Sequence, residues 1–140
     1  MGENVRVNQS PQPKTAPAVL VIDDDEIMRD LVADWLEAAG YRVSKASQCD
    51  DAMEQVKRER PAVIVTDMFM PGPCAEAAIG ELKKVLPGVA IVAVSGHFNS
   101  GQGLCAQAAI AAGASRALAK PIQRSEFLKA IAELAGPPGR

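Results

Sequence analysis

Short apolar runs alternate with amphipathic stretches along most of this chain. The runs lie at residues 18–22, 41–45, 62–66, 89–94 and 115–119, and they are rich in valine, isoleucine and alanine. Such short runs predict strands, and runs that are apolar throughout are typical of a parallel sheet covered on both faces. We therefore predict a five-stranded parallel sheet.

The stretches between the runs have the apolar spacing of helices that pack one face on a core. Ile27, Leu31, Trp35 and Ala38 share one helical face, as do Ile79, Leu82 and Leu86, and also Phe127, Ile131 and Leu134. Ser47 supplies a plausible cap before Asp50 and Asp51, and Gly40, Gly88 and Gly113 supply breaks after helices. The expected fold is an α/β sandwich of (βα)₅ type with a doubly wound sheet.

Length and composition fit one domain. The chain has 140 residues, of which 48% are apolar, enough for one core but too few for two. Residues 1–17 hold three prolines and few large apolar groups, so we expect a disordered tail there. The globular body is expected at residues 18–135, followed by a short tail at 136–140.

Charge and cysteine content argue against several classes of protein. The net charge of −2 provides no strong field for a nucleic acid backbone. The apolar runs are far shorter than the roughly 20 residues that span a bilayer. Three widely spaced cysteines fit neither a disulfide framework nor a metal knuckle. We expect a cytoplasmic protein without nucleic acid or membrane as a partner.

Charged and polar residues follow the predicted strands and are expected to meet at one edge of the sheet. These residues are Asp23, Asp24 and Asp25 after the first strand, Asp67 after the third, Ser95 after the fourth and Lys120 after the fifth. Two carboxylates about 4 Å apart repel by roughly 4 kcal/mol at an effective dielectric near 20. A cluster of carboxylates therefore needs a cation, and oxygen ligands suit Mg²⁺, for which Mn²⁺ can substitute.

The same edge could hold a phosphoryl group. Its oxygens would be shared between the metal, the Lys120 ammonium and the Ser95 hydroxyl. Asp67 is the best candidate for a nucleophile because the middle strand places it centrally, whereas Asp23 and Asp24 form an adjacent pair suited to metal binding. Asp25 alone could equally be a helix cap.

Four motifs in this order resemble the receiver domain of two-component response regulators. They are the segment from Val19 to Arg29 with its acidic residues, Val63 to Pro71 around Asp67, Ser95, and Lys120-Pro121. The resemblance covers nearly the whole body. It implies a flavodoxin/CheY-like sheet with strand order 2-1-3-4-5.

The resemblance also implies a role for each matching residue. Asp67 would be the phosphoacceptor, and Asp23, Asp24, Asp67 and the backbone carbonyl of Phe69 would bind Mg²⁺. Ser95 would be the switch hydroxyl that binds the phosphoryl group with Lys120, and the Lys120–Pro121 peptide would be cis. The donor would be a sensor histidine kinase or a histidine phosphotransfer protein.

Two departures from the family pattern affect the output. Cys74-Ala75 stand where members often carry Asp-Gly, and Ala117 stands where an aromatic residue usually swings inward. A signal must therefore use backbone shifts after Ser95 or another side chain such as Phe98. We further expect that Phe69 and His97 tune the dephosphorylation rate, with bulky Phe69 hindering the attacking water.

The function that we predict is a single-domain response regulator that catalyses only its own phosphorylation and dephosphorylation. It would signal through phosphorylation-dependent binding of an unknown protein to the face formed by the fourth helix, fifth strand and fifth helix. Two alternatives stay open. One is a receiver-like interaction module that needs no phosphorylation, favoured by Ala117. The other is a phosphohydrolase of the haloacid-dehalogenase type, suggested by the Asp23-Asp24-Asp25 segment.

Overall fold

The computed structural model describes residues 16–68, 75–95 and 109–136, and these form a layered α/β fold. In chain order the elements are β1 (Ala18–Ile22), α1 (Glu26–Ala39), β2 (Arg42–Ala46), α2 (Cys49–Glu59), β3 (Val63–Asp67), α3 (Ala75–Val85), β4 (Ala90–Ser95), β5 (Arg116–Ala119) and α5 (Arg124–Ala135). Residues 109–112, before β5, are also helical. Among the described helices, none has both the length and the apolarity that a membrane crossing requires.

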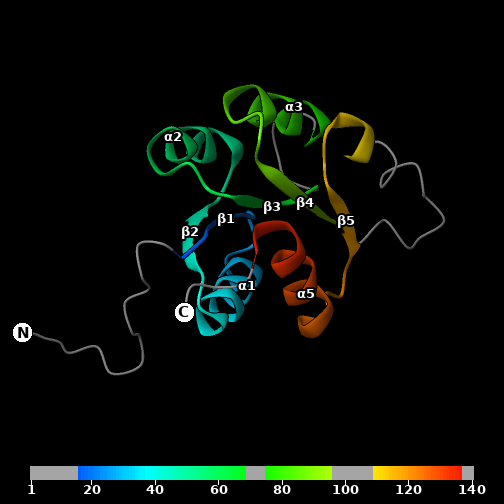
Figure 1. The fold of residues 1–140 in the computed structure, drawn as a ribbon. Coiled ribbons are helices and arrows are strands. Elements are labelled where there is room, and N and C mark those ends of the chain that lie inside the picture. Colours follow the sequence, from blue (N-terminus) through cyan, green and yellow to red (C-terminus); the bar gives the residue numbers. More distant parts are fainter. Residues whose placement is uncertain (1–15, 69–74, 96–108, 137–140) are drawn as a thin grey trace, which may run out of the picture.

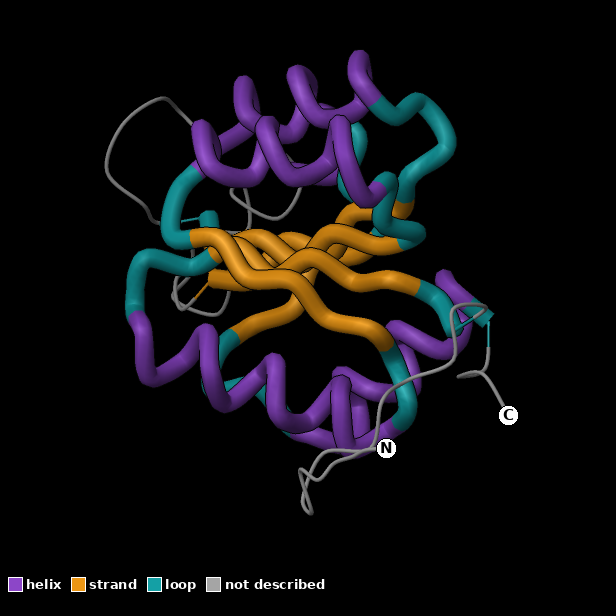
Figure 2. Tube along the Cα trace, turned by 90° about the vertical axis from the view of Figure 1, so that its left-hand side faces the viewer, coloured by secondary structure: helices purple, strands orange, loops and turns teal. Residues whose placement is uncertain are grey.

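The five strands form one parallel sheet in the order β2-β1-β3-β4-β5. Helices α2 and α3 cover one face of the sheet, and α1 and α5 cover the other (Figures 1 and 2). The predicted fold and strand order are confirmed.

β1, β3 and β4 supply side chains to the cores on both sides of the sheet, because successive residues of a strand point to opposite faces. Leu20 and Ile22 of β1 belong to the core under α2 and α3, which also contains Val56, Ile79 and Leu82. Val19 and Val21 belong to the core under α1 and α5, which also contains Leu36, Tyr41, Phe127 and Ile131. This double burial explains why β1, β3 and β4 are apolar almost throughout.

β1 has the predicted boundaries and β5 begins one residue later than predicted, whereas the other three strands are shifted as a whole. β2, β3 and β4 each begin and end one position later than their apolar runs. Asp67 and Ser95 are therefore the last residues of β3 and β4 and do not follow them. Pairing with the neighbouring strand decides where a strand ends, and Asp67 still pairs in register with Val94.

The face of α1 that packs on the sheet is not the one predicted. Val32, Ala33 and Leu36 are buried, whereas Ile27 is 79% exposed and Leu31 is 41% exposed. The helix carries two adjacent apolar stripes, and spacing alone cannot tell which one faces the core. Trp35 lies at the border and packs on the α5 side, with its ring centroid 6.1 Å from that of Phe127.

Helix ends follow the expected chemistry in α1 but not in α2. Gly40 ends α1 in the left-handed conformation at φ 106°, which glycine adopts without strain. Ser47 does not cap α2, because the cap residue is Gln48 and its side chain makes no cap hydrogen bond. The prediction of a Ser47 cap is wrong, since the helix begins one residue later than a Ser47 cap requires.

The ordered body begins before residue 18. Ala16 is buried, and its carbonyl accepts a hydrogen bond from Nε of Arg42 at 2.8 Å. The carbonyl of Pro17 accepts another from the backbone N–H of Arg42 at 3.1 Å. Composition predicts a disordered tail that includes residues 16 and 17, and this is wrong for these two residues because hydrogen bonds from Arg42 hold them on β2.

Candidate functional site

The carboxyl ends of β1, β3 and β5 carry the charged residues of the candidate site. β1 and β3 are neighbours in the sheet although β2 lies between them in the chain. The chain therefore builds outward from β1 in one direction and then in the other, and such a switch point is where doubly wound sheets bind ligands. Asp23 and Asp24 follow β1, and Asp67 ends β3.

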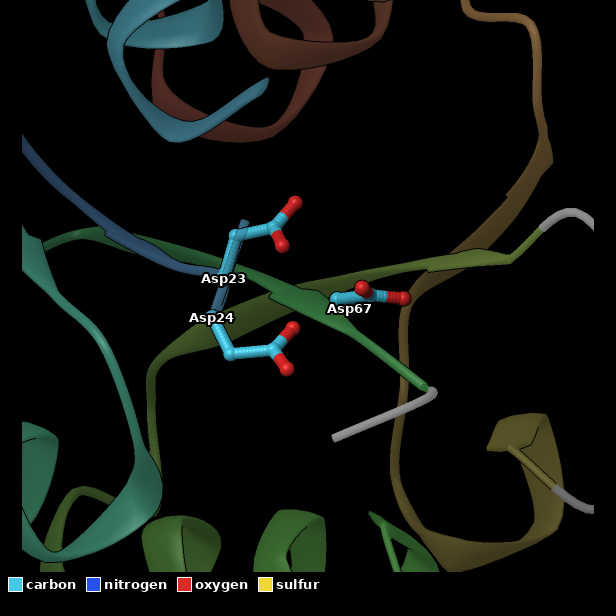
Figure 3. Close-up of side chains that lie close together, drawn as sticks. All are labelled: Asp23, Asp24 and Asp67. Atoms are coloured by element: carbon cyan, nitrogen blue, oxygen red, sulfur yellow. The ribbon is translucent and has the colours of Figure 1, made fainter. Parts of the chain in front are cut away.

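Asp23, Asp24 and Asp67 form one acidic cluster at this switch point (Figure 3). Each offers a carboxylate oxygen, and these oxygens all lie within 4.8 Å of one another. Asp23 and Asp67 are each 6% exposed, whereas Asp24 is open to solvent. The fold thus brings together the three carboxylates that the sequence places at strand ends.

The third acid of the segment, Asp25, has a different task. Its Oδ1 accepts hydrogen bonds from the backbone N–H groups of Ile27 at 3.0 Å and Met28 at 3.4 Å, so it caps α1. Its own backbone N–H donates to Oδ1 of Asp23 at 2.9 Å. Asp25 therefore begins the helix and orients Asp23.

Lys120 follows β5 and reaches the acidic cluster from the other side. Its Nζ lies 3.4 Å from Oδ2 of Asp67 and 3.9 Å from Oδ2 of Asp23. The Lys120–Pro121 peptide is cis. The Lys120 side chain is partly buried, at 26% exposure, and its ammonium provides positive charge beside two carboxylates that repel each other.

The pKa of Asp23 reflects the burial and the charges of the acidic cluster. Burial raises the pKa of Asp23 from 3.8 to about 6, and the neighbouring Asp67 adds to this rise. The hydrogen bond from the Asp25 N–H and the charge of Lys120 both lower the pKa and do not cancel the effect of burial. At Asp23, burial therefore outweighs the attraction of the Lys120 charge.

The donor set of the cluster fits Mg²⁺. All three groups are carboxylates, and Mg²⁺ prefers oxygen ligands and usually keeps several waters in its coordination sphere. Solvent exposure of Asp24 leaves one side of the cluster accessible for such waters. A divalent cation bound by these oxygens would offset the burial and the repulsion from Asp67 that together raise the pKa of Asp23.

Comparison with the sequence models of known protein families identifies the family of this chain. The sequence model of the response regulator receiver domain matches residues 19–132. The chain belongs to this family. The receiver domain is 33% identical over 114 residues to the chemotaxis protein CheY of Thermotoga maritima, and this match covers 81% of the chain and 92% of that protein.

Solved structures of the family share the fold of this receiver domain. A response regulator receiver domain from Clostridium thermocellum has a TM-score of 0.78 at 28% identity, covering 85% of this chain and 94% of that one. A response regulator from Burkholderia pseudomallei, crystallised with a phosphorylated aspartic acid, a calcium ion and citrate, has a TM-score of 0.74 at 29% identity. That match covers 84% of this chain and 66% of the other.

Membership in the receiver family decides against the haloacid-dehalogenase alternative, but it leaves several predicted roles untested. Ser95 ends β4 and pairs with Ala119 of β5, while its side chain lies outside the described part of the structure. Phe69 and His97 also lie outside the described residues. Their roles in metal binding, switching and dephosphorylation stay predictions.

One contact near the site was missed by sequence reasoning. Nη1 of Arg29 donates a hydrogen bond to the backbone carbonyl of Asp23 at 3.0 Å. The signal that could have found it is an arginine one turn into the helix after an acidic turn, within reach of the preceding backbone. In the receiver domain this contact joins α1 to the segment that carries two of the three carboxylates.

Proposed function

We propose that this receiver domain is a phosphorylation switch whose Asp67 takes a phosphoryl group from a phosphohistidine. The observation that carries the proposal is the position of Asp67, which is buried at the switch point, close to two other carboxylates and 3.4 Å from Lys120. The phosphorylated aspartic acid in the Burkholderia pseudomallei response regulator supports it. The donor is a sensor histidine kinase or a histidine phosphotransfer protein.

The metal is Mg²⁺, with Mn²⁺ able to replace it. Asp23, Asp24, Asp67 and the backbone carbonyl of Phe69 are the proposed ligands. When bound, Mg²⁺ supplies positive charge to the oxygens of the transferred group. The three carboxylates, whose oxygens lie within 4.8 Å of one another, support a cation at this place.

The protein groups perform the transfer by position and charge. A carboxylate oxygen of Asp67 bonds to phosphorus while the bond from phosphorus to the imidazole nitrogen breaks, and that nitrogen keeps the electron pair and then binds a proton. Lys120 binds a phosphoryl oxygen, and its ammonium already lies beside Asp67. The Ser95 hydroxyl binds a second oxygen.

The phosphodonor docks on the outward stripe of α1. Ile27 and Leu31 are exposed large apolar residues one helical turn apart, directly after the acidic segment. A protein helix that covers them would have its histidine close to Asp67. This stripe is flanked by acidic residues such as Glu26 and Asp34, so it favours a partner with basic residues beside its apolar contact.

The output is phosphorylation-dependent binding of another protein to the face formed by residues 109–112, β5 and α5. Movement of Ser95 and Lys120 toward the phosphoryl group would shift the ends of β4 and β5, which pair through Ser95 and Ala119. Exposed Ile110 supplies an apolar contact on this face. Ala117 excludes the usual aromatic rotamer, so the signal travels through backbone shifts after Ser95 or through another side chain such as Phe98, which lies outside the described residues.

This proposal extends to the bounds of the functional unit, its compartment and the lifetime of the phosphoryl group. The functional unit is residues 16–135, because Ala16 and Pro17 are hydrogen-bonded to β2, and it works in the cytoplasm. Phe69 and His97 set the lifetime of the phosphoryl group. The substitution Phe69→Asn should speed the loss of phosphate, and an unchanged rate measured by intact mass over time would contradict the role of Phe69.

The proposal is tested by treating the full chain with Mg²⁺ and a small phosphodonor such as acetyl phosphate, followed by intact mass spectrometry. We expect wild type to gain one PO₃ group and Asp67→Asn to gain none. The matched control is Asp51→Asn, which removes an exposed carboxylate from α2 and should behave as wild type. Modification of Asp67→Asn at the wild-type rate would contradict the proposal.

A second candidate is an interaction module that works without phosphorylation, which Ala117 favours. The affinity of a partner protein for wild type and for Asp67→Asn distinguishes this module from a phosphorylation switch. Under this alternative, a protein that binds the chain would bind wild type and Asp67→Asn with equal affinity, with or without the phosphodonor. A difference of more than about fivefold, which is about 1 kcal/mol, would exclude it.

A further inference from the structure

Arg29 ties helix α1 to the carbonyl of a buried site residue. The backbone of Asp23 leaves the sheet directly after β1, where its N–H still donates to the carbonyl of Ala46 in β2 at 3.1 Å. Its carbonyl accepts a hydrogen bond from Nη1 of Arg29, six residues further along the chain, at 3.0 Å. Asp23 is 6% exposed. Loss of the donor to its carbonyl would therefore lower the free energy of unfolding, because a buried carbonyl needs a hydrogen bond.

Asp23 is therefore held at three points. Ala46 fixes its N–H, Asp25 fixes its carboxylate through Oδ1, and Arg29 fixes its carbonyl. The peptide that contains the Asp23 carbonyl also contains the nitrogen of Asp24, so the same contact limits where the exposed Asp24 carboxylate can point. Arg29 itself sits on α1, whose Val32 and Leu36 are anchored in the core.

We propose that Arg29 is a positioning residue for the metal ligands Asp23 and Asp24. It does not ligate the cation, because a guanidinium has no acceptor atom. Its hydrogen bond fixes the segment that presents the two carboxylates, as contacts outside the ligands do in characterised metal sites. This inference rests on the proposed metal site.

The charge of Arg29 and its hydrogen bond to Asp23 predict opposite effects of an Arg29 substitution on the affinity for the cation. A guanidinium near a cation site repels the cation, so loss of its charge alone would strengthen Mg²⁺ or Mn²⁺ binding. Loss of the hydrogen bond frees the segment and spreads the carboxylates, so binding would weaken. The direction of the change therefore separates a positioning role from a purely electrostatic one.

The chain offers a matched control in Arg42. Its Nε donates to the carbonyl of Ala16 at 2.8 Å, beside the opposite end of the same strand β1. Arg29→Met and Arg42→Met thus each remove one bond from arginine to a backbone carbonyl and one positive charge. They differ in their distance from the acidic cluster.

The experiment measures Mn²⁺ binding to the full chain by electron paramagnetic resonance, with urea unfolding recorded for each variant. We expect the Kd of Arg29→Met to rise about tenfold and that of Arg42→Met to stay within about twofold of wild type at a similar loss of stability. Arg29→Gln, whose amide is too short to reach as arginine does, should shift in the same direction as Arg29→Met.

Equal or tighter Mn²⁺ binding by Arg29→Met or Arg29→Gln would overturn the positioning role, as would an equal weakening in Arg42→Met. Failure of the proposed function looks different. If wild type itself binds no Mn²⁺, the metal site is wrong and the role of Arg29 falls with it. If wild type binds Mn²⁺ but Asp67 accepts no phosphate, the role of Arg29 stands while phosphorylation at Asp67 does not.

Discussion

Asp23, Asp67 and Lys120 set the charge balance of the site at the scale of single residues. The two carboxylates are almost closed to water, and one ammonium lies within 3.9 Å of both. Burial outweighs the attraction of Lys120 at Asp23, whose pKa rises to about 6. A proton and a divalent cation should therefore compete for Asp23.

This competition makes metal binding depend on pH. Asp23 must lose its proton before it can ligate, so Mg²⁺ affinity is expected to be constant above about pH 7. It should fall by up to about tenfold for each pH unit below the Asp23 pKa of about 6. Calorimetric titration with Mg²⁺ between pH 5 and 8 measures this affinity. An affinity that does not change with pH would contradict the competition between the proton and the cation.

The metal-free protein should show the linked effect on stability. A carboxyl group whose pKa is higher when folded favours folding in its protonated form, so its contribution is fully present below about pH 3.8 and is lost as pH rises through about 6. The difference in free energy of unfolding between wild type and Asp23→Asn should therefore change in this interval. A pH-independent difference would rule out the raised pKa.

Lys120 is expected to matter for transfer more than for metal binding. Lys120→Met removes a charge that binds a phosphoryl oxygen, so the rate of phosphorylation at saturating Mg²⁺ should fall on the order of 100-fold. The Mg²⁺ affinity of the Lys120→Met variant should not weaken, because the Lys120 ammonium no longer competes with the metal for the carboxylates.

The matched control for Lys120 is Lys45→Met, which removes an ammonium 3.0 Å from Asp30 at the surface. The rate of this variant, followed by intact mass with a small phosphodonor, should equal that of wild type. A rate for Lys120→Met within about threefold of wild type would contradict the assigned role.

At the scale of elements, the strands and the inward faces of α3 and α5 were predictable, because Ile79, Leu82, Phe127 and Ile131 are buried as their spacing predicts, but the inward face of α1 was not. Runs such as Val63–Val65 are apolar because both sides of the strand are buried, so the pattern of apolar residues predicts the strand. Helix α1 has apolar residues on two adjacent stripes. The choice between Leu31 and Val32 depends on how α1 packs on the sheet and on α5, which periodicity does not contain.

The two stripes of α1 should differ in their energetic effect. Leu36→Ala, at a fully buried position, should lower the free energy of unfolding by about 2–5 kcal/mol. Ile27→Ala on the same helix should change it by no more than about 0.5 kcal/mol, because the Ile27 side chain is 79% exposed. Urea denaturation of the two variants compares them, and a loss of more than about 2 kcal/mol for Ile27→Ala would contradict the burial pattern.

The hydrogen bonds at the start of α1 were also not predictable from the sequence. Asp25 was open to two interpretations, because an acid after a strand can cap a helix or bind a metal. Its hydrogen bonds to the N–H groups of Ile27 and Met28 identify it as the cap. The contact from Arg29 to Asp23 was missed because it joins a side chain to a backbone carbonyl, and residue types alone do not reveal such contacts.

At the scale of the whole molecule, strand order creates the site. The order β2-β1-β3-β4-β5 brings Asp23 and Asp67 together although 43 residues separate them in sequence. This gathering was predictable because crossovers in parallel sheets have one hand and strand ends share one edge. The exact strand ends and the packing of residues 16 and 17 were not, because both depend on hydrogen bonds between strands.

The central claim is that Asp67 is the group that carries phosphate. Borohydride reduces an aspartyl phosphate to homoserine, so the decisive measurement is peptide sequencing by mass spectrometry after treatment with acetyl phosphate, Mg²⁺ and then borohydride. The result that we predict is homoserine at position 67 and unmodified aspartate at positions 23 and 24. Homoserine at another position, or none at 67 in protein that has gained a PO₃ group, would contradict the claim.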